Sequence, residues 1–206
     1  MNPTSISKLS AIVLAGGHSR RLGSDKALLL WQGEYLIQRI VRLLKQRFKE
    51  IWVVTDETKR YKDLLDVPVL EDVIKNKGPM GGLYTGLLAS TNDYNFVTAC
   101  DMPLVNLNVI DLIIREIDGS QVIVPEISGF KSPTIALYHR SCLLKIEKML
   151  KSKDWSLQSL LRSVSTKVIS EESIRRVDPQ LRCFTNLNTP EDWQRLTLWM
   201  ESNAKW

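Results

Sequence analysis

The sequence predicts an α/β fold, a single Rossmann-like domain whose mostly parallel sheet is covered by helices on both faces. Two observations favour it. Short apolar runs recur through the first 125 residues, and stretches with helical spacing of apolar residues separate several of them. The runs are continuously apolar rather than alternating, as expected of strands buried on both faces.

Five strands are predicted from these runs, over 11–15, 51–55, 67–70, 96–100 and 121–125. Three helices are predicted between and after them, over 36–48, 80–90 and 107–117. In the first helix, Leu36, Ile40 and Leu44 lie on one stripe while most basic residues lie off it. The second is predicted despite its glycines.

The later third of the chain is more mixed. Its predicted elements are a strand over 133–138, helices over 139–150 and 155–164, short strands at 168–169 and 183–184, and a helix over 190–200. Thr189 is the expected N-cap of the last helix, with Glu191 and Asp192 in its first turn. There is no internal repeat or linker, so residues 1–206 are predicted to form one domain, with 1–9 and 201–206 frayed.

The composition excludes several classes of protein. Apolar residues make up 44% and charged residues 25% of the 206, as in an ordinary globular protein. No apolar run approaches the roughly 18 residues of a membrane span, and no signal peptide is expected. Three scattered cysteines without zinc spacing indicate a reducing compartment, so we expect a cytoplasmic location. The net charge of +5 suggests an anionic partner without identifying it.

The loop after the first predicted strand is the most informative segment. Gly16 and Gly17 would let backbone N–H groups approach a phosphate or a base closely, and Arg20, Arg21 and Lys26 add positive charge. Neither a Walker loop nor a dinucleotide-binding fingerprint is present. The alternative at this point is a tight turn with solvated cations.

The same loop resembles a known family. The motifs LAGG from Leu14, SRRLG from Ser19 and Asp25-Lys26 are similar to the signature of GT-A-like nucleotidyltransferases, and the double glycine with Asp-Lys resembles the molybdenum cofactor guanylyltransferases. Those enzymes join GMP from GTP to molybdopterin and release pyrophosphate. The resemblance implies that Arg21 faces the phosphates and that the nucleotide is held by Leu14, Ala15, Gly16, Gly17 and Lys26. Cytidylyltransferases of similar type tend to carry Leu-Ala-Ala-Gly, in which the methyl group of the second Ala narrows the space for a purine. Gly16 lacks this methyl group, which favours a purine and hence GTP.

Two further segments resemble the family's nucleotide-binding residues. Asp72 follows the third predicted strand and is implied to contact the guanine nucleotide; the alternative is a helix cap or an acidic turn. The segment GPMGG, with Gly78 and Gly82 as implied nucleotide contacts, is similar to the family's Gly-Pro-Leu-Ala-Gly. An Asn is frequent in the family after the second strand, but this chain has Thr55 and Asp56 there.

The remaining matches to the family concern the residues implied to bind the metal ion and the acceptor substrate. Asp101, in Asp-Met-Pro at a predicted strand end, is implied to bind Mg²⁺, which takes one or two carboxylates plus phosphate oxygens. Asn188, in Asn-Thr-Pro-Glu, is implied to be a second, neutral metal ligand or a positioner of the acceptor; a plain helix boundary is the alternative, and for Asn186 that alternative is favoured. The segment 131–134 resembles the acceptor side, although a solvated turn explains it equally well.

The implied reaction transfers GMP from GTP to the terminal phosphate of molybdopterin, with Arg21, Lys26 and Asp101 as catalytic residues. Implied partners are GTP, molybdopterin, proteins of cofactor synthesis and recipient molybdoenzymes. The alternatives are a related enzyme that uses CTP or a sugar or polyol phosphate acceptor, and a non-catalytic nucleotide-binding homologue. Nucleic-acid binding is not expected, because basic and aromatic residues are not interleaved and no helix-turn-helix pattern occurs.

Overall fold

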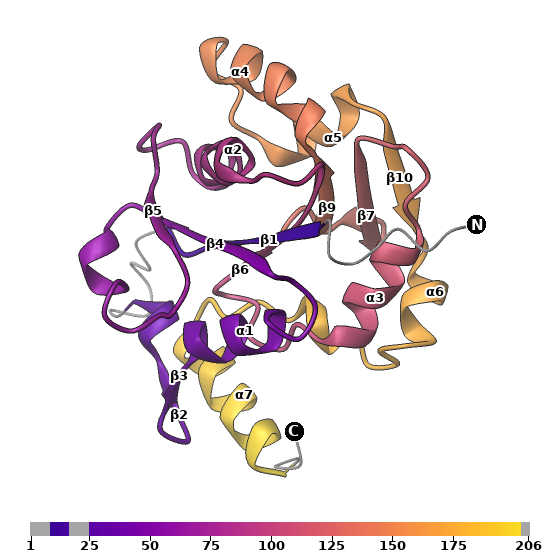
Figure 1. The fold of residues 1–206 in the computed structure, drawn as a ribbon. Helices are drawn as coiled ribbons and strands as arrows, with labels where there is room; N and C mark the ends of the chain where they lie inside the picture. The colour runs from indigo at the N-terminus through magenta and orange to yellow at the C-terminus, as the bar shows by residue number, and fades with distance from the viewer. Residues whose placement is uncertain (1–8, 17–24, 203–206) are drawn as a thin grey trace.

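A computed structural model describes residues 9–16 and 25–202. The described part contains a twisted central sheet with helices on both faces, which confirms the α/β prediction (Figure 1). Leu9 belongs to the first strand, and the last helix continues to Ser202. Residues 1–8 and 203–206 lie outside the described part.

The central sheet has the strand order β10-β7-β9-β6-β1-β4-β5, with β8 paired to β7. Its strands are β1 (Leu9–Leu14), β4 (Glu50–Thr55), β5 (Val69–Glu71), β6 (Tyr94–Ala99), β7 (Val122–Ile127), β8 (Phe130–Lys131), β9 (Ile135–His139) and β10 (Thr166–Ile169). Strand β9 runs antiparallel to β6 and β7, whereas β10-β7, β6-β1, β1-β4 and β4-β5 pair in parallel. The carboxyl ends of β1, β4, β5 and β6 therefore meet at one edge of the sheet.

Helices cover both faces (Figure 1). One face carries α1 (Leu36–Leu44), α3 (Leu107–Arg115), α6 (Glu171–Arg175) and α7 (Pro190–Ser202); the other carries α2 (Pro79–Ala89), α4 (Leu143–Lys151) and α5 (Leu157–Ser163). Along β1, Ala11 and Val13 join the core on the α1 side, and Ile12 and Leu14 join the core on the α2 side. Burial on both faces is the reason the strand reads as a continuous apolar run.

One predicted strand is wrong. Residues 182–184 form the short 3-10 helix η5 (Arg182–Phe184) instead of the strand predicted at 183–184. The carboxylate of Asp178 accepts a hydrogen bond from the backbone N–H of Cys183 at 2.9 Å, and Leu181 adopts a left-handed φ of 53°. These local contacts turn the chain away from the extended conformation that a strand needs.

Several short strands and helices were not predicted from the sequence. The hairpin β2 (Leu30–Trp31) and β3 (Glu34–Tyr35) turns at Gln32-Gly33, and β7 turns into β8 at Ser128-Gly129. All four turn residues have positive φ, so the X-Gly dipeptides between apolar residues were the available signal. Helix α6 was also missed, although its N-cap Ser170 accepts a hydrogen bond from the N–H of Ser173. The other short 3-10 helices are η2 (Lys26–Leu28), η3 (Thr58–Arg60) and η4 (Arg140–Cys142).

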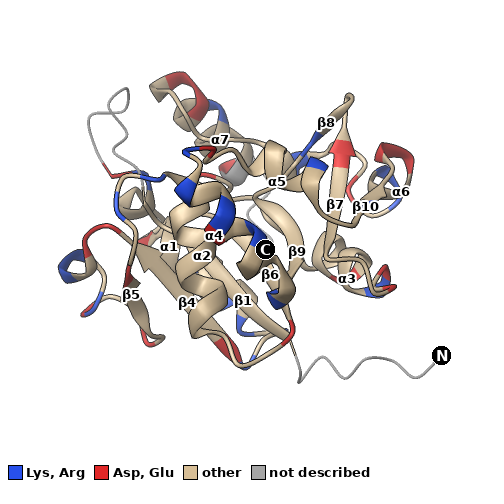
Figure 2. Ribbon diagram, turned by 90° about the horizontal axis from the view of Figure 1, so that it is seen from above, with Lys and Arg blue, Asp and Glu red and all other residues tan. Residues whose placement is uncertain are grey.

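No helix within the described residues is both long and apolar enough to cross a membrane. Seen from the α2 and α4 side, the Lys and Arg residues of the described part are interspersed with Asp and Glu (Figure 2).

Candidate active site

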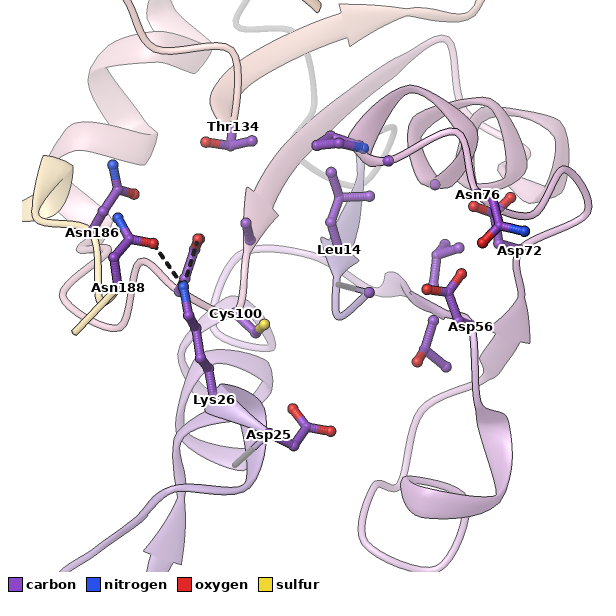
Figure 3. Close-up of a pocket in the computed structure, with 18 residues that line it drawn as sticks. Leu14, Asp25, Lys26, Asp56, Asp72, Asn76, Cys100, Thr134, Asn186 and Asn188 are labelled. Carbon is purple, nitrogen blue, oxygen red and sulfur yellow. Dashed lines mark hydrogen bonds and ion pairs between the residues drawn. The ribbon is translucent and has the colours of Figure 1, made fainter. Parts of the chain in front are cut away.

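A cavity of about 480 Å³ lies at the edge of the sheet where the parallel strands end (Figure 3). Segments distant in sequence supply its walls: the ends of β1, β4 and β6, the start of α2, and the segment that precedes α7. Its lining includes eight residues that the sequence singled out: Leu14, Gly16, Lys26, Asp72, Gly78, Gly82, Asp101 and Asn188. This edge is the usual ligand position in open α/β sheets.

Three of these residues meet at one end of the cavity. Lys26 Nζ donates a hydrogen bond to Asn188 Oδ1 at 2.7 Å and lies 3.7 Å from Asp101 Oδ2 (Figure 3). The backbone N–H of Leu187 donates to the carbonyl of Asp101 at 2.8 Å, which ties the segment before α7 to the end of β6. The ammonium group of Lys26 and the side-chain oxygens of Asp101 and Asn188 therefore lie close together at this end of the cavity.

Asp101 is partly withdrawn from water. Burial raises the pKa of its carboxyl, and the nearby ammonium of Lys26 opposes that rise. A divalent metal ion beside this carboxylate would stabilise its charged form more than Lys26 does, because the ion would offset more of the free-energy cost of burying the charge.

The donor set at this end fits Mg²⁺. The ion prefers oxygen ligands and usually binds one or two carboxylates together with substrate phosphates and water, rather than a cage made by protein alone. Asp101 offers the carboxylate and Asn188 the amide oxygen. In the described residues no group of three or more Asp, Glu, His or Cys is placed to hold a metal, so phosphate oxygens would have to complete the coordination.

Lys26 is positioned by its neighbour Asp25. The Asp25 carboxylate caps η2 by accepting the backbone N–H of Ala27 at 3.1 Å, and it also accepts the hydroxyl of Tyr61 at 2.6 Å. Arg60 lies 3.4 Å from the same carboxylate. Burial, together with the hydrogen bond to Asp25, raises the pKa of Tyr61, so this hydroxyl remains a donor. In the sequence Asp25 was recognised only as part of a motif, and its hydrogen bonds to Ala27 and Tyr61 could not be predicted.

The opposite end of the cavity is acidic. Asp72 Oδ1 accepts the hydroxyl of Thr85 at 2.9 Å and the backbone N–H of Ile74 at 3.0 Å. Burial raises the pKa of Asp72, and the nearby carboxylate of Asp56 adds to the rise. The backbone contact supports the reading of Asp72 as a turn residue, while its place on the cavity wall suits the implied role as well. Asp56 is exposed and also lines the cavity.

The glycines at the start of α2 are required by geometry. Gly78 has φ 57° and ψ −149°, a conformation that side chains with a Cβ rarely adopt. At Gly81, a Cβ would lie 2.6 Å from Asp72 Oδ2 and 2.8 Å from the carbonyl oxygen of Ile74. The replacement of the family's usual Ala by Gly81 thus lets the Asp72 carboxylate sit close against the helix.

Some predicted site residues lie elsewhere. Ala15 does not line the cavity: its backbone N–H donates to the carbonyl of Val54 at 2.8 Å, and its methyl group is buried in the core on the α1 side. Gly17 and Arg21 lie outside the described residues. Lining residues that the sequence did not assign to a site include Asp56, Asn76 and Cys100. Thr134, from the segment that resembles the acceptor side, and Asn186, for which a plain helix boundary was favoured, also line the cavity.

Comparison with known proteins identifies the family. A family model described as the MobA-like NTP transferase domain matches residues 11–168. The chain belongs to this family. Its fold is therefore that of a nucleotidyltransferase of the MobA-like family, and the non-catalytic alternative is not supported.

Relatives of the MobA-like chain are similar over most of its length. A molybdenum cofactor guanylyltransferase of Syntrophotalea carbinolica is 36% identical over 188 residues, which cover 90% of this chain and 89% of the relative. A probable molybdenum cofactor guanylyltransferase of Methanosarcina acetivorans is 35% identical over 207 residues, covering 93% and 91%. The crystal structure of the molybdopterin-guanine dinucleotide biosynthesis protein A of Archaeoglobus fulgidus has a TM-score of 0.83 at 23% identity, covering 94% and 99%, and shows the same fold.

Proposed function

We propose that this protein transfers GMP from GTP to the terminal phosphate of molybdopterin and releases pyrophosphate, with Mg²⁺ as cofactor. The observation that carries the proposal is the polarity of the cavity, with Lys26, Asp101 and Asn188 at one end and Asp56 and Asp72 at the other. The first set suits a triphosphate with its metal, and the second suits a base. The guanylyltransferase names of the relatives point to the same reaction.

The chemistry asks little of a general base. The attacking phosphate is already an anion, so the enzyme must hold two polyanions together and offset their repulsion. Lys26 would neutralise charge that develops on the leaving pyrophosphate, and Asp25 with Tyr61 keeps its backbone in place. Arg21 is proposed to assist from the preceding loop. Asp101 and Asn188 would hold the Mg²⁺ ion, which supplies further positive charge at the phosphate oxygens.

The acidic end of the cavity favours guanine over the other bases. The hydrogen-bonding edge of guanine carries two adjacent donors, N1–H and the 2-amino group, and a carboxylate can accept from both. Adenine, cytosine and uracil each present an acceptor next to their donor on this edge, and a carboxylate repels that acceptor. Asp72 is already bound to Thr85 and Ile74, so the exposed Asp56 is the carboxylate available to the base.

Calorimetric titration with GTP, ATP, CTP and UTP, each with Mg²⁺, tests the base preference. We expect GTP to bind at least about tenfold more tightly than CTP, since one charged hydrogen bond contributes about 1.5–3 kcal/mol. The Asp56→Asn variant should lose most of that preference, while Asp63→Asn, on an exposed loop residue outside the cavity lining, should keep it. A clear CTP preference of the unmodified protein would instead favour a cytidylyltransferase.

The acceptor is tested by pyrophosphate release. With Mg-GTP and molybdopterin the protein should release pyrophosphate, and with sugar or polyol phosphates it should not. Release with those acceptors and none with molybdopterin would refute the proposed acceptor while leaving the nucleotide assignment intact.

A further inference from the structure

A second cavity, of about 560 Å³, lies on the α1 side of the sheet. Its walls are α1, the segment from Pro103 to Asn108 that leads into α3, the segment 177–182, and part of α7. Among the described residues, none lines both this cavity and the candidate active site. Its volume falls in the range of pockets that bind small organic molecules, roughly 300–1,000 Å³.

The second cavity carries an excess of positive charge. Three arginines line it, Arg39, Arg42 and Arg182, against one carboxylate, Asp178. Asp178 is buried and already accepts a hydrogen bond from the backbone N–H of Cys183. An anion entering the cavity would therefore meet guanidinium groups and little opposing charge.

Two of these guanidinium groups form no ion pair with a carboxylate of the described residues. Arg42 is paired with Glu34 through two hydrogen bonds of 2.9 and 3.0 Å, but neither Arg39 nor Arg182 forms an ion pair with any described residue. Each lies over a tryptophan ring instead, Arg39 at 4.6 Å from the centroid of Trp31 and Arg182 at 4.0 Å from that of Trp199. Burial and the neighbouring charge of Arg42 lower the pKa of Arg39, and the nearby carboxylate of Glu34 partly opposes this change.

The rest of the lining is largely apolar. Aliphatic side chains in the lining are Ile40, Leu43, Leu104, Leu107 and Val177. Inorganic phosphate alone would leave this surface exposed to water, whereas a compound with both an anionic group and an apolar body would cover it.

We infer that the second cavity is a binding site for an amphipathic organic anion, meaning a small molecule that carries a phosphate, sulfonate or carboxylate on an apolar ring or chain. The anionic group would bind to Arg39 and Arg182, whose planar donors match such groups. The apolar part would contact the aliphatic wall.

An occupant of this site would contact the segments that carry active-site residues. Pro103, Leu104 and Val105 line the second cavity and begin two residues after Asp101 in the chain. Arg182 lines the second cavity, and the same segment continues to Asn188 in the first. The hydrogen bond from Leu187 N–H to the Asp101 carbonyl joins the two segments. The site is therefore placed to influence the metal-binding end of the active site.

Titration with 8-anilinonaphthalene-1-sulfonate, a fluorescent amphipathic anion, tests the inference on the whole protein. We expect saturable binding of one molecule per chain. The affinity should fall at least about tenfold in the double variant Arg39→Gln/Arg182→Gln. It should also fall in Gln46→Trp, which places a large side chain at an exposed lining position without removing an arginine. Thermal unfolding of each variant checks that the fold is retained.

Two controls separate this site from other surfaces. Arg162→Gln, an exposed arginine on α5 outside the cavity, and Lys26→Ala, in the active site, should both bind the probe as the unmodified protein does. Unchanged affinity in folded Gln46→Trp and Arg39→Gln/Arg182→Gln, loss of binding in Lys26→Ala, or complete displacement of the probe by GTP would each overturn the inference. None of these readouts requires nucleotidyl transfer, so the proposed function can fail without affecting the result.

Discussion

Replacement of Lys26 by Met tests the centre of the candidate active site. The substitution keeps the aliphatic stem, which is largely buried, and removes the ammonium. A hydrogen bond from a charged donor contributes about 1.5–3 kcal/mol, which corresponds to a change of about 10- to 150-fold in Kd. In the free protein Nζ already binds Asn188 and Asp101, so part of the phosphate interaction replaces existing contacts. We therefore expect the Kd of Mg-GTP to rise by about 10- to 50-fold.

Isothermal titration calorimetry measures this change directly. Lys45→Met is the matched control, because Lys45 lies at the end of α1 and pairs with Asp66 away from the cavity. Its GTP affinity should be unchanged. A Lys26→Met variant that is folded and binds GTP within twofold of the unmodified protein would remove Lys26 from the nucleotide site, and with it the assignment of this end of the cavity to the triphosphate.

Three further predictions follow from the same geometry. Asp101→Asn should abolish Mg²⁺-dependent pyrophosphate release while thermal unfolding stays cooperative; near-normal turnover would contradict the metal assignment. Burial raises the pKa of Asp101 above its ordinary value of 3.8, so ionisation of the carboxyl costs stability as the pH rises from that value. Urea unfolding should therefore show Asp101→Asn gaining stability relative to the unmodified protein as the pH rises above 3.8. A difference that is constant with pH would show that the carboxyl is not perturbed. Gly81→Ala should lower the free energy of unfolding by up to about 2 kcal/mol, because overpacking against Asp72 and the Ile74 carbonyl costs about 1–3 kcal/mol and the helix-propensity gain offsets only about 1 kcal/mol of it; a gain in stability would refute this.

Local patterns predicted most of the regular elements. The strands of the central sheet except β8 and the longer helices follow from apolar runs and helical spacing, and the N-cap of α7 follows from its sequence, since Thr189 Oγ1 accepts the N–H of Asp192 at 3.1 Å. The errors fall where short-range contacts outweigh the apolar pattern. At 183–184 an apolar pair predicted a strand. The hydrogen bond from Cys183 N–H to the Asp178 carboxylate and the left-handed conformation of Leu181 stabilise a 3-10 helix there instead.

The candidate site was predicted in part. Residues in recognisable motifs at strand ends, such as Asp72 and Asp101, could be proposed because strand ends of a parallel sheet share one edge. Asp56 stood in the sequence only as a departure from the family pattern, and its position on the cavity wall emerged from the packing of β4 beside β1. The second cavity had no sequence signal, since its walls come from four separate segments.

The sequence by itself determined the fold class, the family resemblance and the identity of the charged residues at the strand ends. These features depend on neighbours within a few residues or on motifs that can be read along the chain. The tertiary structure decided which groups meet: Lys26 with Asn188 across 162 positions, Asp25 with Tyr61, and Asp72 with the glycine at the start of α2. The physical reason is that hydrogen bonds and ion pairs act over a few ångströms of space, while the sequence specifies only the order in which these groups follow one another.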